Sequence, residues 1–446
     1  MPRPATTSQG QLDPRASRRI NLLLIHQNFP GQFRHLAQEL QQHPGYRVQA
    51  IARETAPGLS GIHLQRYHPA RSSTAATHPY LLSFESAVLH GQQVARVLLQ
   101  QRTKGYRPDV ILAHPGWGET LFIKDIYPET PLIHFCEYYY RAQGADADFD
   151  PEFPLTLDRM ARIRVRNSLH LLNLEQCDLA VTPIAWQHSL HPTAYQEKIR
   201  VIHEGIQLPR LQPDANATLQ LPNGRTLKAG QPVITYVARN LEPYRGFHRF
   251  MRALPRLLAR HPTAEVVIVG ADGVSYGQRP VDAPDWRSKL LAENPLDLER
   301  VHFLGRVPYA TYRRVLQVSA AHVYLTYPFV LSWSMLEAMA CGCLLVGSDT
   351  APVREVIEHG RNGYLVDFFD EQALIESVLQ ALEQPERQRP LRAAARRTAE
   401  RYSSEFGCQQ YRQLLQQAIA KSATSRNSQR VGEASRMHIQ AGPLDV

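Results

Sequence analysis

The residues best suited to hold a phosphorylated ligand lie late in the chain. Residues 329–342, FVLSWSMLEAMACG, follow an apolar run and pass into a helical pattern. Ser332 is a favourable N-cap, and the amides near Trp333 and Ser334 would then lie at the positive end of a helix dipole. A helix start of this kind binds phosphate groups, and Glu337, about one turn further in, can accept hydrogen bonds from ribose hydroxyls.

Two arginines in an earlier loop offer matching positive charge. Residues 236–247, YVARNLEPYRGF, carry Arg239 and Arg245 directly after an apolar strand pattern. Guanidinium groups bind phosphate oxygens and would neutralise a diphosphate as negative charge builds on a leaving group. A surface salt bridge is the alternative interpretation for each arginine.

Polar residues also follow predicted strands in the N-terminal half. Gly31 lies in HQNFPGQFRH after the first strand, His114 begins HPGWGE, and His134 and Glu137 lie in HFCEYYYR. Ligands of α/β proteins bind at the carboxyl ends of parallel strands, so the second and third of these loops are predicted to hold the acceptor and the reaction centre. Histidines at strand ends are often structural, so the catalytic group stays open among His114, His134 and Glu137.

Short apolar runs alternate with helical patterns along the chain, which is typical of βαβ units and parallel sheets. The predicted strands of the first half cover residues 20–26, 47–52, 110–114, 131–135 and 179–182. Those of the second half cover residues 233–237, 265–269, 301–304, 321–325 and 344–347. The pattern predicts an α/β protein with two Rossmann-like domains.

Composition shifts set the expected boundaries. Polar ends are predicted to be disordered, and a stretch rich in proline and glycine separates the two series of strands. The predicted parts are a disordered N-terminus over 1–18, a first domain over 19–206, a linker or surface loop over 207–231, a second domain over 232–400, a helix over 401–420 that we expect to cross back to the first domain, and a disordered tail over 421–446.

The overall composition limits the functional classes. The 446 residues carry a formal net charge of +9, but no basic runs interleaved with aromatic residues, so nucleic-acid binding is not expected. Five cysteines without zinc-ligand spacing indicate free thiols in a reducing compartment. No apolar stretch approaches the roughly 20 residues of a membrane span and the start lacks a secretory pattern, so a cytoplasmic location is expected.

No metal site is predicted. Asp146 and Asp148 form an Asp-x-Asp pair, yet they follow a polar stretch rather than an apolar strand. With Asp150 they suggest a calcium loop, but Pro151 stands where such a loop needs glycine.

Residues 329–342 resemble glycosyltransferase family 4, whose members carry a Glu, seven residues and a second Glu in LEAMAxG. Glu337 matches the second Glu, which implies that it binds the donor ribose and that amides around Trp333 and Ser334 approach the diphosphate. Phe329 departs from the family, because it stands where the first Glu contacts the donor sugar.

Further segments are similar to the same family. Arg239 and Arg245 match the Arg and Lys of its phosphate-binding loop. The segment VHFLGRV resembles the strand and loop beside the nucleotide base, which implies base contacts from Arg306 and Val307. Gly31 would face the donor across the cleft.

The resemblance covers about residues 20–400, and within the family it extends to one particular bacterial subgroup. It implies a GT-B fold with two Rossmann-like domains whose parallel sheets face an interdomain cleft. It further implies retaining transfer of a sugar from a nucleoside diphosphate sugar to a hydroxyl acceptor, in polysaccharide or glycoconjugate synthesis. The acceptor would be a saccharide or a lipid-linked saccharide. In the second case the protein would contact the inner face of a membrane peripherally. No cofactor and no metal are expected, because Arg239, Arg245 and the helix start supply positive charge.

Two alternatives stay open at this stage. Another enzyme of the same fold, such as a nucleotide-sugar epimerase, would convert the donor without an acceptor. Phe329 motivates the second, a catalytically weakened subunit that binds a sugar nucleotide.

Overall fold

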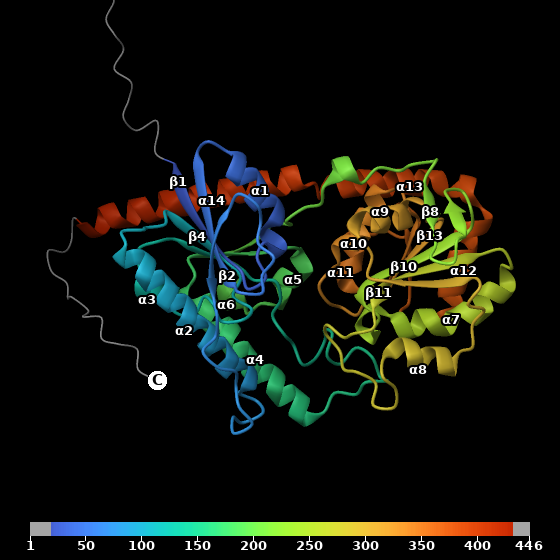
Figure 1. The fold of residues 1–446 in the computed structure, drawn as a ribbon, viewed down its shortest axis with the longest axis horizontal. Coiled ribbons are helices and arrows are strands. Elements are labelled where there is room, and N and C mark those ends of the chain that lie inside the picture. The colour runs from blue at the N-terminus through green and yellow to red at the C-terminus, as the bar shows by residue number, and fades with distance from the viewer. Residues whose placement is uncertain (1–18, 431–446) are drawn as a thin grey trace, which may run out of the picture.

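The computed structural model describes residues 19–430, which fold into two α/β domains lying side by side (Figure 1). Residues 1–18 and 431–446, where disordered ends are predicted, lie outside the described residues. The two Rossmann-like domains predicted from the strand pattern are confirmed.

The first domain is built on a seven-stranded parallel sheet in the order β3-β2-β1-β4-β5-β6-β7. Its strands are β1 Ile20–Ile25, β2 Tyr46–Arg53, β3 His63–Tyr67, β4 Val110–Ala113, β5 Leu132–Phe135, β6 Leu179–Thr182 and β7 Ile199–Val201. Its helices are α1 Arg34–Gln42, α2 Leu82–Thr103, α3 Ile123–Ile126, α4 Leu157–Gln176, α5 Ala185–Leu190 and α6 Thr193–Gln196. The central strands are continuous apolar runs because helices cover both faces of the sheet.

The second domain carries a six-stranded parallel sheet in the order β12-β11-β10-β13-β14-β15. Its strands are β10 Val233–Asn240, β11 Glu265–Ala271, β12 Val301–Gly305, β13 Ala321–Tyr324, β14 Leu345–Ser348 and β15 Tyr364–Val366. Its helices are α7 Phe247–Arg260, α8 Trp286–Glu293, α9 Tyr309–Gln317, α10 Trp333–Ala340, α11 Ala351–Arg354, α12 Glu371–Glu383 and α13 Pro385–Glu400. In both sheets the strand order reverses beside the first strand, β1 or β10, where α/β proteins open a ligand crevice.

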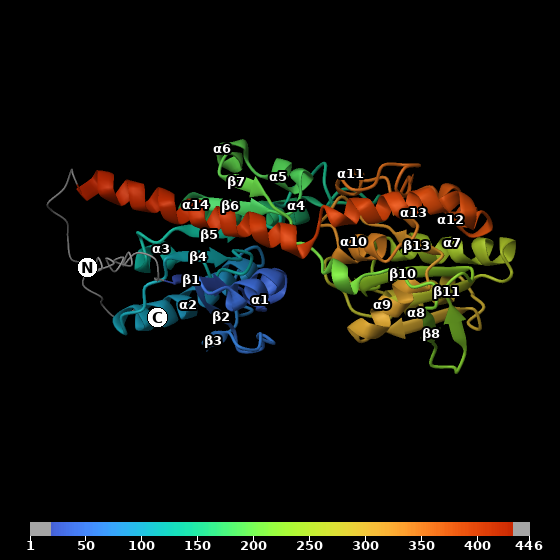
Figure 2. The same ribbon diagram turned by 90° about the horizontal axis from the view of Figure 1, so that it is seen from above.

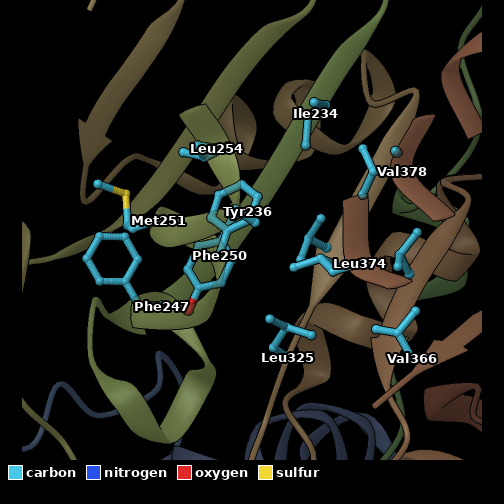
Figure 3. Packing of buried hydrophobic residues seen from close by; sticks show 14 of the residues in the cluster. Ile234, Tyr236, Phe247, Phe250, Met251, Leu254, Leu325, Val366, Leu374 and Val378 are labelled. Atoms are coloured by element: carbon cyan, nitrogen blue, oxygen red, sulfur yellow. The ribbon is translucent and has the colours of Figure 1, made fainter. Parts of the chain in front are cut away.

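Aromatic packing anchors the core of the second domain. Tyr236 of β10 stacks on Phe250 of α7 with ring centroids 5.1 Å apart, and Leu254 lies one turn further along the helix (Figure 3). Phe247, Phe250, Met251 and Leu254 recur at helical spacing, so α7 presents one apolar face to the sheet. This packing fixes the end of β10, which carries Arg239, and the loop with Arg245 that follows it.

The segment 207–231 differs from the predicted linker. It contains the antiparallel hairpin of β8 Thr218–Gln220 and β9 Thr226–Lys228. Leu219, Leu221 and Leu227 are buried against β10 and β11, so the hairpin is part of the second domain. The prediction of a surface loop is wrong here because alternate leucines form an apolar face within a polar stretch.

The C-terminal helix joins the two domains. α14, Ser404–Arg430, leaves the second domain after α13 and lies along the first domain (Figures 1 and 2). Tyr411, Leu414 and Leu415 pack into the core around α1 and β1. The helix continues through residues 421–430, where the sequence predicts the start of a disordered tail.

The loop between β5 and α4 also reaches the second domain. Asp150 accepts hydrogen bonds from His248 at 2.9 Å and Tyr327 at 2.6 Å, and Asp146 accepts one from Tyr244 at 2.9 Å. The domains are therefore tied together on the side of the cleft opposite α14.

Candidate functional site

A cavity of about 340 Å³ lies between the carboxyl ends of the two sheets. Arg239, Arg245, Ser332 and Trp333 line its second-domain wall. Gly31, Gln32, Arg34, Glu137 and Glu204 line its first-domain wall. The structure thus brings together residues that lie up to about three hundred positions apart in the chain.

The two arginines on the second-domain wall differ in how they are held. The guanidinium group of Arg245 is buried and donates 2.9 Å hydrogen bonds to the Thr326 hydroxyl and the Val330 carbonyl oxygen. Arg239 is exposed to the cavity, and no carboxylate within residues 19–430 lies at ion-pair distance from it. A fixed cation and a free one therefore face the same space, which is an arrangement that suits a phosphate ligand.

A glycine makes this loop possible. Gly246 follows Arg245 in a left-handed conformation with φ of +68°, and a Cβ there would lie 2.2 Å from the Leu325 side chain. Only glycine lets the chain turn from β10 into α7 while keeping Arg245 against the cavity.

The start of α10 forms the floor of the cavity. The Ser332 hydroxyl caps the helix by accepting from the Ser334 amide at 3.3 Å, and the Ser332 amide donates to the Tyr324 hydroxyl at 2.8 Å. Ser332 and Trp333 line the cavity, whereas Ser334 is buried beside it. The positive end of the helix dipole therefore lies at the cavity that Arg239 and Arg245 also line.

Three of the residues assigned to ribose or base binding lie away from the cavity lining. The Glu337 carboxylate accepts hydrogen bonds from Tyr309 at 3.0 Å and Tyr312 at 2.6 Å, and burial raises its pKa against the effect of these hydroxyl groups. Arg306 is exposed, and Val307 packs in the apolar clusters around β10 and α10. These residues continue the second-domain wall past the start of α10, outside the enclosed volume.

On the first-domain wall, polar groups link the loops after β1, β4 and β5. Gln32 donates to Glu137 at 2.7 Å and is bonded to the His26 ring at 2.7 Å. His114 Nε2 lies 3.7 Å from Glu137 Oε2, and its ring stacks on Trp117. Burial alone would raise the pKa of Glu137, but His114 and the Gln32 amide outweigh it and hold the pKa below the usual carboxyl value. Glu137 is therefore ionised at neutral pH.

Gly31 brings the chain into close contact with this group. Its φ is +46°, and a Cβ there would lie 2.4 Å from the His26 ring. The loop after β1 can approach the cavity only because this position has no side chain.

His134 is not part of the site, which corrects the prediction of a catalytic role. It lies within β5, is fully buried, and has a pKa lowered by burial to about 3. β5 continues to Phe135, so the side chain of His134 lies inside the sheet instead of in the loop that follows. Of the three catalytic candidates, Glu137 lines the cavity, and His114 lies directly behind it.

The acidic loop around Asp150 does bring three possible metal ligands together. Donor atoms of Asp150, Glu152 and His248 lie within 4.8 Å of one another. The carboxylates already have partners, however, because Tyr327 and His248 bind Asp150 and the Arg252 guanidinium binds Glu152. Asp150 and Glu152 therefore form part of the contact between the two domains.

Two family models match the chain. The one described as Glycosyl transferase family 4 group matches residues 44–211, and the one described as Glycosyl transferases group 1 matches residues 220–398. The chain belongs to glycosyltransferase family 4.

Curated relatives of this family 4 protein match it over part of their length. Spore coat protein SA of Bacillus subtilis is 25% identical over 51% of this chain and 59% of its own. D-inositol 3-phosphate glycosyltransferase of Rhodococcus jostii is 28% identical over 48% of this chain and 46% of its own. Phosphatidyl-myo-inositol mannosyltransferase of Mycolicibacterium smegmatis is 28% identical over 48% and 59%. The chain spans about half the length of these relatives.

Solved structures share the fold of the family 4 protein across both domains. Sucrose-phosphate synthase from Thermosynechococcus elongatus has a TM-score of 0.70 at 19% identity, covering 90% of this chain and 100% of that one. HepE of Anabaena, in complex with UDP and glucose, has a TM-score of 0.64 at 16% identity over the same shares. These likenesses confirm the GT-B arrangement that the sequence resemblance implies.

The departure at Phe329 has a structural explanation in this family 4 protein. Phe329 is buried among Tyr138, Tyr244 and Tyr276, with ring centroids 4.7, 5.6 and 4.8 Å away. The Arg245 guanidinium lies 5.3 Å from the Tyr276 ring and 5.9 Å from the Phe329 ring. An aromatic cluster therefore occupies the position of the family's first Glu.

Several residues that line the site were not predicted, chiefly Gln32, Glu204 and Tyr276. Gln32 is adjacent to the predicted Gly31 and could have been found from the same loop. Glu204 follows the short strand β7, and a polar residue just past a strand end is the relevant signal. Tyr276 lies in the loop after β11. Three backbone amides of this loop donate hydrogen bonds to the Glu242 carboxylate, which holds the loop in place.

None of the helices within residues 19–430 combines the length and the apolar character needed to cross a bilayer.

Proposed function

We propose that this protein is a retaining glycosyltransferase that moves a sugar from a nucleoside diphosphate sugar to a hydroxyl acceptor. The observation that carries the proposal is the interdomain cavity, with two arginines and a helix start on one wall and an ionised carboxylate on the other. The UDP and glucose complex of the similar Anabaena protein supports the same class of donor.

The second domain would hold the donor diphosphate. Arg245 is preorganised by Thr326 and Val330, so it loses little freedom on binding, and the unpaired Arg239 can close on the phosphate. Together with the start of α10 they stabilise the charge that develops on the leaving diphosphate. This positive field supports a reaction that needs no metal ion.

Glu337 and its neighbours would hold the nucleoside. Tyr309 and Tyr312 orient the Glu337 carboxylate, which keeps free acceptor capacity for ribose hydroxyls. Val307 offers an apolar contact for the base, and Arg306 is free to approach it from solvent.

The first domain would provide the reaction centre. The negative charge of Glu137 faces the donor site and can stabilise the positive charge that builds at the anomeric carbon. Gln32 and His114 hold that carboxylate in place. Enclosure of the cavity by both domains limits hydrolysis of the donor by water.

We further propose a role in the synthesis of a polysaccharide or glycoconjugate in the cytoplasm, with the acceptor presented at the inner face of a membrane. The exposed leucines Leu81, Leu82 and Leu157 support a peripheral contact, because they lie at the starts of the neighbouring helices α2 and α4. Arg159 and Arg162 follow on α4 and would attract anionic headgroups.

Calorimetry with a panel of nucleoside diphosphates and their sugars tests the donor site. We expect one nucleotide to bind wild-type protein and to raise its melting temperature at saturation. The product formed with an acceptor should keep the anomeric configuration of the donor, as NMR would show. Absence of binding by every nucleotide would contradict the proposal, conversion of the donor without acceptor would favour an epimerase, and binding without turnover would favour a binding subunit.

A further inference from the structure

A second, larger cavity adjoins the donor site. It encloses about 710 Å³ and is lined by the starts of α2 and α4, by the loops after β1, β4 and β5, and by a few second-domain residues. Tyr276 lines both cavities. Phe329 lines the larger one, while the next residues, Val330 to Trp333, line the donor cavity. The two spaces therefore meet at the aromatic cluster around Phe329.

The lining of the larger cavity is strongly cationic. It contains five arginines, namely Arg53, Arg141, Arg159, Arg162 and Arg166. Asp146 is the one carboxylate among its described lining residues, and it already accepts hydrogen bonds from Tyr138 at 2.8 Å and Tyr244 at 2.9 Å. The lining thus holds a clear excess of positive charge.

Some of this charge is paired and some is free. Arg53 lies 4.0 Å from Glu54, Arg162 is 2.8 Å from Asp158, and Arg141 donates to backbone carbonyls. Arg159 donates a 3.5 Å hydrogen bond to the Tyr244 hydroxyl, but neither Arg159 nor Arg166 has a carboxylate at ion-pair distance within residues 19–430. Two guanidinium groups are therefore available to a ligand.

The spacing along α4 turns these charges into a row. Positions 159, 162 and 166 recur at helical intervals, so they share one face over about 10 Å of the helix axis. The Arg166 guanidinium lies 3.9 Å from the centre of the Tyr140 ring, and that of Arg162 lies 5.7 Å from the Tyr80 ring. The rings limit the freedom of the two cations, which lowers the entropic cost of binding an anion.

Aromatic side chains also line the cavity, beside the arginines. Trp117, Tyr140, Tyr276 and Phe329 lie in its lining. Such flat apolar faces with polar edges suit a sugar ring, whereas the arginine row does not. The cavity therefore combines aromatic faces suited to a sugar ring with neighbouring guanidinium groups suited to an anion.

We propose that this cavity is the acceptor site and that its acceptor is a saccharide or polyol bearing a phosphate group. The inference rests on the proposed function, since it assigns the substrate class of the same reaction. The phosphate lies on Arg159 and Arg166, and the sugar ring extends along the aromatic faces. Its hydroxyl group then reaches the junction at Tyr276, opposite the donor.

The test uses full-length protein saturated with the nucleoside diphosphate that it binds, so that the donor site is closed to other anions. Calorimetric titration with glucose 6-phosphate is compared with titration with glucose. We expect glucose 6-phosphate to bind about tenfold more tightly, because a charge-assisted hydrogen bond contributes on that scale.

Variants of α4 locate the phosphate. Arg159→Gln and Arg166→Gln should each weaken glucose 6-phosphate binding about tenfold without changing the affinity for glucose. Arg164→Gln is the matched control, since Arg164 is exposed on the opposite face of the same helix and lines neither cavity. Affinity for the nucleoside diphosphate should be unchanged in all three variants.

A vesicle experiment distinguishes a free phosphate from a lipid headgroup. Binding to phosphatidylglycerol vesicles, but not to phosphatidylcholine vesicles, that is lost in Arg159→Gln and Arg166→Gln would assign the phosphate to a lipid-linked acceptor. The proposal is overturned if the two α4 variants bind both glucose 6-phosphate and phosphatidylglycerol vesicles as wild type does. Failure of the donor proposal shows itself separately, as absence of nucleotide binding, and the two phosphate measurements are then made on the unliganded protein.

Discussion

The Trp333 indole donates a hydrogen bond to the Glu204 carboxyl group across the two domains, with 2.5 Å between nitrogen and oxygen. Trp333 begins α10, and Glu204 follows the last strand of the first domain. Burial raises the pKa of Glu204 to about 7, although the indole hydrogen bond opposes this. A contact between the domains at the edge of the interdomain cavity therefore involves a group with a pKa near neutral pH.

Glu204→Gln should change how stability depends on pH. The carboxyl group binds its proton more tightly when folded than when unfolded, so ionisation destabilises the folded protein as the pH rises from about 4.5 to about 7. Over that window the unfolding free energy of wild type should fall by about 3 kcal/mol relative to the variant. Chemical denaturation at several pH values measures the difference.

The difference between the two proteins is the informative quantity. Buried histidines such as His203, whose pKa burial lowers to about 4, act in the opposite direction and are common to both proteins. A constant difference between pH 4.5 and 7 would show that folding does not raise the pKa of Glu204.

Arg239→Ala should weaken nucleoside diphosphate binding by about 10- to 100-fold, the value of one charge-assisted phosphate contact. Stability should hardly change, because the Arg239 side chain is exposed and has no carboxylate partner in the described chain. Calorimetry and thermal unfolding of the same samples give both quantities. Arg387→Ala on α13 is the control, and equal nucleotide affinity in the two variants would remove Arg239 from the site.

The central strands of the fold were predictable because a short run of neighbouring residues is enough to indicate each of them. Buried parallel strands are continuous apolar runs, as in β4 and β10, and these were located within a few residues. The edge strands β3 and β7 were missed, since HLQRY and IRV mix polar and apolar residues. Their pairing depends on neighbours that are distant in sequence.

The candidate site was predictable where polar residues or a glycine stand at, or shortly after, the carboxyl end of a long strand. Arg239 and Gly31 were found in this way, and the structure places both in one cavity. His134 misled because it lies within β5 itself, where its side chain is fully buried between the sheet and the helices instead of reaching the end of the strand. Glu204 was missed because β7, the short strand that it follows, was itself not predicted, and because its contact with Trp333 depends on how the domains sit against each other.

Glu137→Gln should lower turnover by about a hundredfold while nucleotide affinity stays the same, since the charge acts on the reaction centre and not on the diphosphate. The amide keeps the size of the side chain but removes its charge. Because the pKa of Glu137 lies below its ordinary value of 4.5, activity of wild type should fall only at lower pH, as the carboxylate becomes protonated. A pH profile of turnover checks this, and an acid limb near pH 6 would point to another group.

Glu242→Gln should loosen the loop that joins the two cavities. The Glu242 carboxylate accepts the amides of Ser275, Tyr276 and Gly277 at 2.9, 3.1 and 2.8 Å. An amide in its place turns one acceptor into a donor facing backbone N–H groups, at a cost of about 1–3 kcal/mol. Hydrogen exchange should become faster at residues 275–277, and KM should rise for donor and acceptor together because Tyr276 lines both cavities. Glu383→Gln, an exposed change on α12, should leave exchange unaltered; a rise in KM for only one substrate would mean that Tyr276 does not separate the two sites.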